Sequence, residues 1–370
     1  MGTLEQMFTG HSTESFLARH WPDQHLVCHG APERLGPLID LPEFSQLDVL
    51  LGSYRDQVRV ALPDKRDEHS SLKVDGVTAA ALHGSGMALI LNGVERFLPL
   101  VSDWLNELRL ELGLPAGCEP RSIIYVTPSG AGNSPHFDAN ANFVMQLRGT
   151  KRWHLAPNAH VPHPTDRWAM NETSMSEELR GCVTGPLPTT MPIDAEVIDL
   201  HPGSVLFVPR GYWHATESDE DTLSLNFTFG QPTWADVVLS ALRRKLLRHD
   251  SWRQLARADL PALNVKLAAL QAEVLTAAEV NAAFEEEAAV YHLASDAFLS
   301  VEDGKALASE ELVLELGEHL HPVFEWLGAQ GGPFSVAEAA LLFPEVAPEL
   351  KAMFEALAAR GLLISGSVKA

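Results

Sequence analysis

A histidine and an aspartate stand one residue apart in residues 134–153, SPHFDANANFVMQLRGTKRW. Side chains alternate between the two faces of a β-strand, so His136 and Asp138 at a strand start point to the same face. A second histidine, His214, comes after the apolar run SVLFVPRGYW at the end of another expected strand. Two imidazoles and one carboxylate leave the opposite side of a metal open, which suits Fe(II) that must also bind a co-substrate and dioxygen.

An HxD pair alone also arises by chance, and the alternative is a surface turn with a hydrogen-bonded histidine. The order of the later residues favours the metal site: Lys151 on the same or the next expected strand, then Pro-Arg-Gly before Trp213 and His214, then LSLNFTF. Four other histidines lie in proline-containing or strand-flanking segments, where surface or core-capping roles are expected instead of a second metal site: His154, His160, His163 and His201.

The strands that must position these residues are short and separated by Gly and Pro. They are expected within residues 121–130, 142–157, 195–218 and 222–230. Strands of this length, separated by Gly and Pro, predict a sandwich or barrel of the jelly-roll type. Residues 86–113 predict a strand and then a helix, because five apolar residues have near-helical spacing: Phe97, Leu98, Val101, Trp104 and Leu108.

The β pattern ends after Pro232. Residues 234–260 and 263–293 are rich in Ala and Leu with helical periodicity, which predicts packed helices. Residues 321–367 predict three short helices and a final apolar strand. Among residues 315–370 acidic side chains outnumber basic ones, so the footprint expected of a nucleic-acid-binding unit is missing.

Length and composition limit the classes of protein to which the chain can belong. The chain has 370 residues, 46% of them hydrophobic and 21% charged, as in an ordinary globular protein of two or three domains. We expect a cytoplasmic protein, since no secretory signal or membrane-length apolar run is visible. Three cysteines without a CxxC pair, Cys28, Cys118 and Cys182, argue against disulfides or structural zinc.

The formal net charge of −22 argues against binding of nucleic acid, whose phosphates are also negative. The same charge would attract a basic protein or peptide, although the simpler interpretation is that it only keeps the protein soluble.

The segments YVTPSGAGNSPHFDANANFVMQLRGTKRWHLAP, HPGSVLFVPRGYWHATES and LSLNFTF together resemble the JmjC-type cupin hydroxylases, and more narrowly their ribosomal-oxygenase branch. The resemblance implies a mixed α and β fold with a double-stranded β-helix (jelly-roll) core. It also implies a helical dimerisation segment and a C-terminal winged-helix-like unit. We therefore expect a catalytic domain with its N-terminal extension at 1–232, a helical segment at 233–305 and a winged-helix-like domain at 306–370.

Residue by residue, the resemblance implies that His136, Asp138 and His214 are the iron ligands. It implies that Lys151 binds the distal carboxylate of 2-oxoglutarate, because a dicarboxylate entering a low-dielectric barrel must have its far charge paired. The alternative is a solvated lysine at a strand end.

Asn142 and Asn226 align with polar positions of the co-substrate pocket in asparaginyl-hydroxylase relatives, or are ordinary buried amides. Ser134 and Tyr125 are weaker candidates for the same pocket.

The expected function is Fe(II)- and 2-oxoglutarate-dependent hydroxylation of a side chain in a protein or peptide. The resemblance suggests a ribosomal protein, hydroxylated at the β-carbon of Arg or His. Alternatives are tailoring of a peptide natural product, a histone-type demethylase, or a non-catalytic metal-binding cupin. We expect residues 160–194 to border the substrate groove, and residues 234–299 to form a homodimer; no nucleic-acid or membrane partner is expected.

Overall fold

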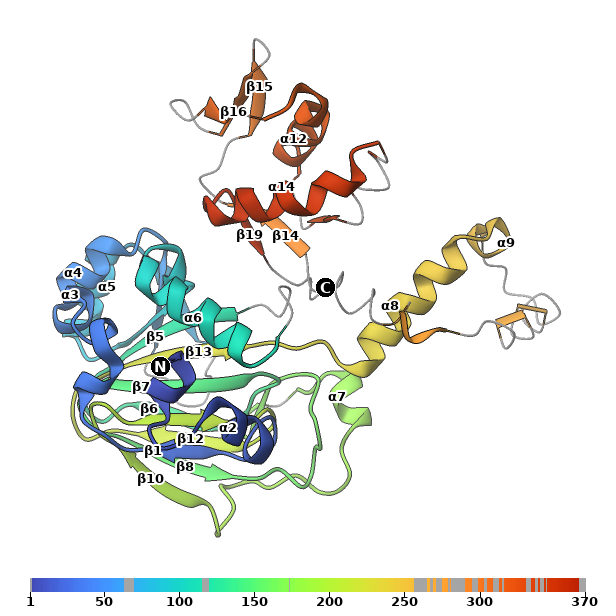
Figure 1. The fold of residues 1–370 in the computed structure, drawn as a ribbon. Coiled ribbons are helices and arrows are strands. Elements are labelled where there is room, and N and C mark those ends of the chain that lie inside the picture. Colours follow the sequence, from blue (N-terminus) through green and yellow to red (C-terminus); the bar gives the residue numbers. More distant parts are fainter. Residues whose placement is uncertain are drawn as a thin grey trace. The chain divides into compact units, whose positions relative to one another are not determined.

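The structure is a computed structural model, and its elements are shown in Figure 1. By contact density the chain divides into two compact units, residues 1–114 with 120–230, and mainly residues 231–370. The structure describes residues 2–62, 70–114, 120–172, 174–255, 265–266, 269–270, 275–278, 280, 290–294, 299–302, 305–308, 313–314, 316–330, 334–336, 339, 343 and 345–365.

Two antiparallel sheets form the core of the first unit. The eight-stranded sheet has the order β1 (Leu26–Cys28), β11 (Val205–Val208), β7 (Ala141–Arg148), β13 (Thr222–Phe229), β5 (Pro120–Thr127), β4 (Ala88–Asn92), β2 (Val58–Ala61) and β3 (Ser71–Val74). The five-stranded sheet has the order β10 (Glu196–Leu200), β8 (Lys151–Ala156), β12 (Trp213–Glu217), β6 (Gly132–Phe137) and β9 (Trp168–Ala169). The crossovers between non-consecutive strands confirm the predicted jelly-roll core.

Helices cover the larger sheet (Figure 1). The helix predicted after residue 96 is confirmed as α6 (Pro99–Glu111), whose buried face carries Val101, Trp104, Leu105 and Leu108. It is accompanied by α3 (Pro42–Ser45), α4 (Leu47–Ser53), α5 (Gly76–Gly84) and the 3-10 helices η1 (Pro32–Leu38) and η2 (Val94–Arg96).

The N-terminal segment packs on the central strands through aromatic rings. Helices α1 (Thr3–Met7) and α2 (Thr13–Arg19) bring in Phe8 and Phe16. The ring of Phe16 lies 6.0 Å from that of Phe143 on β7 and 5.2 Å from that of Phe207 on β11. This packing buries one face of β7 and β11.

The second unit begins with α8 (Trp234–Leu247), which is succeeded by α9 (Asp250–Arg253). Two small three-stranded sheets come next, β18 (Phe334–Ser335), β14 (Val290–Leu293) and β19 (Leu363–Ser365), and β15 (Ser300–Glu302), β16 (Lys305–Leu307) and β17 (Val313–Leu314). The remaining described helices are η3 (Glu318–Leu320), α12 (His321–Gly328) and α14 (Ala347–Ala359).

The structure differs from the sequence-based prediction at the end of residues 263–293. Val290–Leu293 is a strand that pairs with β18 and β19, not the end of a helix. The physical reason is the run of a β-branched and an aromatic residue, Val290 and Tyr291, which favours extended backbone when a sheet edge is near. Much of the predicted helical pattern before it lies outside the described residues.

The strand at 290–293 pairs with strands beyond residue 305, although the predicted helical segment was to extend to residue 305. Among the described residues, no helix is long and apolar enough to cross a membrane.

Candidate active site

Strands β6 and β12 bring the two predicted histidines together. His136 and His214 are direct partners in this antiparallel pair, and their ring centroids lie 4.1 Å apart. The register shifts between His214 and Thr216, and there the strands approach so closely that a Cβ on Gly132 would collide with the Thr216 carbonyl oxygen. Glycine at position 132 therefore permits the close pairing that sets the histidines side by side.

Asp138 lies just after β6 and completes a cluster of three. Each of His136, Asp138 and His214 offers a ligand atom, and these atoms all lie within 4.8 Å of one another. Within the described residues this is the one group of three or more such side chains. Asp138 Oδ2 lies 3.6 Å from His214 Nε2 and accepts a hydrogen bond of 3.0 Å from Asn142 Nδ2.

Backbone carbonyls orient both imidazoles. The Nδ1 atom of His136 lies 2.7 Å from the Ser134 carbonyl oxygen, and that of His214 lies 2.9 Å from the Tyr212 carbonyl oxygen. A carbonyl oxygen only accepts, so each Nδ1 carries the proton and each Nε2 keeps a lone pair directed at the cluster. This is the tautomer that a metal-ligating histidine needs, and its outer nitrogen is held as in known metal sites.

Charge in the cluster also suits a divalent cation. Burial and the neighbouring His136 ring lower the pKa of His214 to about 4, so this imidazole is neutral at physiological pH. Burial opposes ionisation of Asp138, but His136, His214 and Arg167, with the hydrogen bond from Asn142, hold the pKa of this carboxyl below its ordinary value. A neutral imidazole and an ionised carboxylate are the forms that bind a metal.

Lys151 begins β8 inside the same unit and is 4% exposed. Its Nζ donates a 2.9 Å hydrogen bond to Thr127 Oγ1 and lies 5.9 Å from the Tyr125 ring centroid. Burial lowers the pKa of Lys151 to about 8. Burial is the cause of this shift and no described carboxylate forms an ion pair with Nζ, so the buried ammonium fits an anion that no described residue supplies.

The other predicted pocket residues have varied surroundings. Asn142 accepts from Thr228 Oγ1 at 2.8 Å while donating to Asp138, so it orients a member of the cluster. Asn226 on β13 is 8% exposed, and its Oδ1 is buried without a hydrogen-bond partner among the described residues. Ser134 contributes its main-chain carbonyl oxygen to His136.

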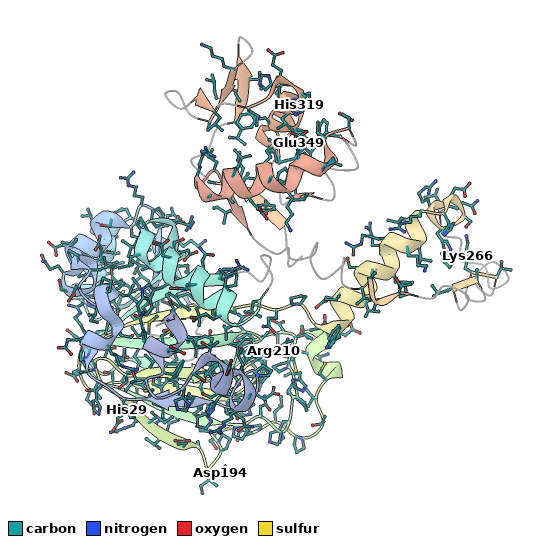
Figure 2. All side chains as sticks on the ribbon, in the orientation of Figure 1. His29, Asp194, Arg210, Lys266, His319 and Glu349 are labelled. Carbon is teal, nitrogen blue, oxygen red and sulfur yellow. The ribbon has the colours of Figure 1, made fainter. Side chains whose placement is uncertain are left out.

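Residues 160–194, expected to border the groove, are connected to the elements of the cluster by strand pairing and hydrogen bonds. They contain β9, which pairs with β6, and a short helix, α7 (Glu177–Gly181). Arg210, labelled in Figure 2, donates from Nε to the Pro164 carbonyl oxygen at 2.8 Å. The Gly211 N–H donates to the Asp138 carbonyl oxygen at 2.9 Å, so the turn before β12 joins this segment to the end of β6.

Three neighbours of the cluster were not found from the sequence. The Trp153 ring stacks on that of His214, with centroids 5.7 Å apart. Arg167 lies 3.7 Å from Asp138, and Glu172 lies 2.7 Å from Arg167. The only signal for Arg167 and Glu172 was their place in the long segment after β8, which identifies no single residue.

Three of the four remaining histidines have the unremarkable surroundings that the sequence predicts. His154 lies 3.2 Å from the exposed Glu217, and His201 lies 3.1 Å from Thr150 Oγ1. The backbone carbonyl of His160 accepts from Thr184, within the segment after β8.

Comparison with known proteins gives a consistent family. Residues 111–237 match the JmjC domain. The chain is 35% identical to YxbC of Bacillus subtilis over 258 residues, which cover 68% of this chain and 78% of that protein. It is 30% identical to ribosomal oxygenase 1 of Rattus norvegicus over 203 residues, or 53% of this chain and 30% of that protein.

A solved structure of YcfD, a ribosomal oxygenase from Escherichia coli in complex with cobalt and 2-oxoglutarate, is similar at a TM-score of 0.48. Its sequence identity is 16%, with 96% of this chain and 98% of that chain covered. The chain spans most of YxbC but under a third of the rat ribosomal oxygenase.

Proposed function

The chain belongs to the JmjC-domain family, in the branch of the ribosomal oxygenases, and we propose that it is an Fe(II)- and 2-oxoglutarate-dependent oxygenase that hydroxylates a side chain in a protein or peptide. One observation carries the proposal. A metal-competent cluster and a buried lysine without a carboxylate partner among the described residues share one jelly-roll unit. A metal and a dicarboxylate are the two groups that would satisfy both features.

His136, Asp138 and His214 would hold the iron. Three protein ligands would leave further positions on the metal for a co-substrate and dioxygen. When bound, iron and 2-oxoglutarate supply the oxidising chemistry that inserts an oxygen atom into a C–H bond. The chain supplies orientation, through the Ser134 and Tyr212 carbonyl oxygens and the Asn142 amide.

Lys151 would pair with the distal carboxylate of 2-oxoglutarate. The Thr127 hydroxyl holds the ammonium in place, and the burial that lowers the lysine pKa also strengthens any charge pair formed there. Pairing with a dianion raises that pKa again, so the bound co-substrate keeps Lys151 protonated. Asn226 on β13, whose amide is buried, and Tyr125, whose ring lies beside Lys151 Nζ, complete the pocket as we propose it.

The substrate we propose is a basic polypeptide, in first place a ribosomal protein hydroxylated at Arg or His. Two relatives support this choice by name, ribosomal oxygenase 1 of Rattus norvegicus and the bifunctional lysine-specific demethylase and histidyl-hydroxylase NO66 of Brugia malayi. The net charge of −22 would draw a basic segment to the protein by electrostatic steering.

Mass spectrometry of ribosomal proteins from cells with and without the gene tests this function. We expect one ribosomal protein to carry an added oxygen only when the gene is present. Purified, iron-loaded protein with 2-oxoglutarate should then add the same oxygen to that protein and release succinate. Efficient hydroxylation of a free amino acid, with no turnover on any ribosomal protein or peptide, would contradict the proposal.

We also propose the division into a catalytic domain, a dimerisation segment and a winged-helix-like domain. Four apolar side chains of α8 are exposed in the single chain, which supports a dimer formed there: Trp234, Val238, Leu239 and Leu247. Light scattering at micromolar concentration should give the mass of a dimer, and a monomer would contradict this part of the proposal.

A further inference from the structure

The register of β6 and β9 places a cation beside the carboxylate of the cluster. Phe137 is opposite Trp168 and His136 is opposite Ala169 in this antiparallel pair. Continued by one residue, the register sets Arg167 opposite Asp138, and directly opposed residues share a face of the sheet. The Arg167 Nε atom accordingly lies 3.7 Å from Asp138 Oδ1.

This cation is permanent, because a guanidinium does not lose its proton in proteins. It therefore faces the cluster at every pH at which the protein is folded. An arginine can take both oxygens of a carboxylate in a forked pair of hydrogen bonds. In that arrangement Asp138 would be shared between Arg167 and a bound metal, and binding of the metal would be weaker.

In the structure the guanidinium binds Glu172 instead. A turn in which the Glu172 N–H donates to the Ala169 carbonyl oxygen brings the glutamate back to the arginine. Arg167 Nη1 then donates to Glu172 Oε1 at 2.7 Å, a full hydrogen bond, whereas its 3.7 Å approach to Asp138 is too long for one. The guanidinium is thus bound to Glu172 and only borders Asp138.

The two oxygens of Asp138 consequently have different surroundings. Oδ2 faces His214 and is held by the Asn142 amide, while Oδ1 borders the guanidinium. The side chains of the three charged residues are partly buried, at 31% exposure for Arg167, 24% for Asp138 and 19% for Glu172. Solvent therefore screens their interactions only in part.

We propose that Glu172 is a positioning residue of the metal centre, which holds Arg167 away from Asp138 so that the aspartate stays available to a divalent metal. The inference rests on the proposed function, because it requires the metal to bind at His136, Asp138 and His214. It predicts that the effect of losing Glu172 passes through Arg167.

Cobalt(II) binding to the metal-free, full-length protein tests the inference, by calorimetry and by the visible absorption of the bound ion. Four forms are compared at pH 7: wild type, Glu172→Gln, Arg167→Met and the double variant. Glu172→Gln should weaken cobalt binding about tenfold, the low end of the range for outer partners of metal ligands. Arg167→Met alone should not weaken it, and adding Arg167→Met to Glu172→Gln should restore binding to within about threefold of wild type.

Glu178→Gln, an exposed glutamate in the same segment, is the matched control and should bind cobalt as the wild type does. Recovery in the double variant excludes misfolding as the cause of weak binding in Glu172→Gln. Two results would overturn the inference alone: unchanged binding by Glu172→Gln, or equal losses in both single variants without recovery in the double. If wild type itself bound no cobalt, the proposed function would fail and the inference with it.

Discussion

The two units of the chain differ in whether their described buried residues include polar side chains. Every described buried polar or charged residue lies in the first unit, and the set includes His136, Asn142, Lys151, His214 and Asn226. The described buried residues of the second unit are apolar or aromatic, and most of them form a cluster around Phe324 and Phe354, while Val237 and Ala241 belong to a separate one. Polar pairs of the second unit lie at its surface, as with His319 and Glu349 in Figure 2.

The first unit therefore contains the buried polar groups that a reaction needs, whereas the described core of the second unit consists of packed apolar side chains. A polar group in an interior is unfavourable unless it is hydrogen-bonded, and a charge is more so. The first unit contains a buried ammonium, Lys151 Nζ, and a buried amide oxygen without a partner among the described residues, Asn226 Oδ1, where a ligand is proposed. Among the described residues of the second unit, no charged side chain is buried in this way.

The largest effect is expected from removing a member of the cluster. His214→Ala leaves two ligands, so the purified protein should retain no measurable iron and release no succinate from 2-oxoglutarate. His154→Ala, on β8 but outside the cluster, is the control and should behave as wild type. Unchanged iron content in His214→Ala would refute the ligand assignment.

A core substitution in the second unit should strongly lower the stability of that unit. It should leave ligand binding at the candidate site unchanged. Phe354 is fully buried, so Phe354→Ala should lower the free energy of unfolding of that unit by about 3–5 kcal/mol. Cobalt and 2-oxoglutarate affinities should not change. Calorimetric unfolding with the exposed Glu355→Ala as control checks the first expectation, and a loss of cobalt affinity in Phe354→Ala would break the proposed separation of roles.

The sequence could predict those parts of the site that depend only on residue types and their spacing along a single strand. HxD at a strand start and a histidine after PRGYW identify His136, Asp138 and His214 without any knowledge of pairing. The jelly-roll core was predictable from strand length and punctuation, and α6 from its apolar spacing.

The remainder depends on register between strands distant in sequence. Thr127 on β5 meets Lys151 on β8, and Arg167 stands opposite Asp138 only because β9 pairs with β6. Nothing in the local sequence specifies either pairing. The strand at Val290–Leu293 was missed for the same reason, since its partners lie at residues 334–335 and 363–365.

Lys151→Met should stabilise the ligand-free protein while weakening co-substrate binding. Lowering of the lysine pKa from 10.5 to about 8 corresponds to about 3 kcal/mol of destabilisation at neutral pH, an order-of-magnitude figure. The unfolded chain binds more protons between pH 8 and 10.5, so this penalty is complete below pH 8 and disappears as the pH rises to 10.5. Methionine of similar length removes the charge and keeps the packing.

Chemical denaturation at pH 7 measures that gain, and calorimetry measures 2-oxoglutarate binding, which should weaken by roughly 2–5 kcal/mol. Thr127→Val, which removes only the hydroxyl partner of the ammonium, is the comparison and should weaken 2-oxoglutarate binding less. A destabilised Lys151→Met protein, or one that still binds 2-oxoglutarate tightly, would argue for an ordinary structural lysine.

The smallest effect is a pH dependence confined to the first unit. With a pKa of about 8, Lys151 in the ligand-free protein loses its proton just above physiological pH, and only the ammonium pairs with a carboxylate. The dissociation constant of 2-oxoglutarate should therefore be constant below about pH 7 and rise about tenfold for each pH unit above 8.

Lys151→Arg isolates the cause, because a guanidinium keeps its charge throughout this range. In that variant the dissociation constant should stay level up to about pH 10, whatever its absolute value. Cobalt affinity, measured in parallel, should not show the same curve, since His214 and Asp138 have pKa values below their ordinary ones and do not titrate there. A wild-type profile that is flat above pH 8, or one that rises equally in Lys151→Arg, would mean that the buried ammonium is not what holds the co-substrate.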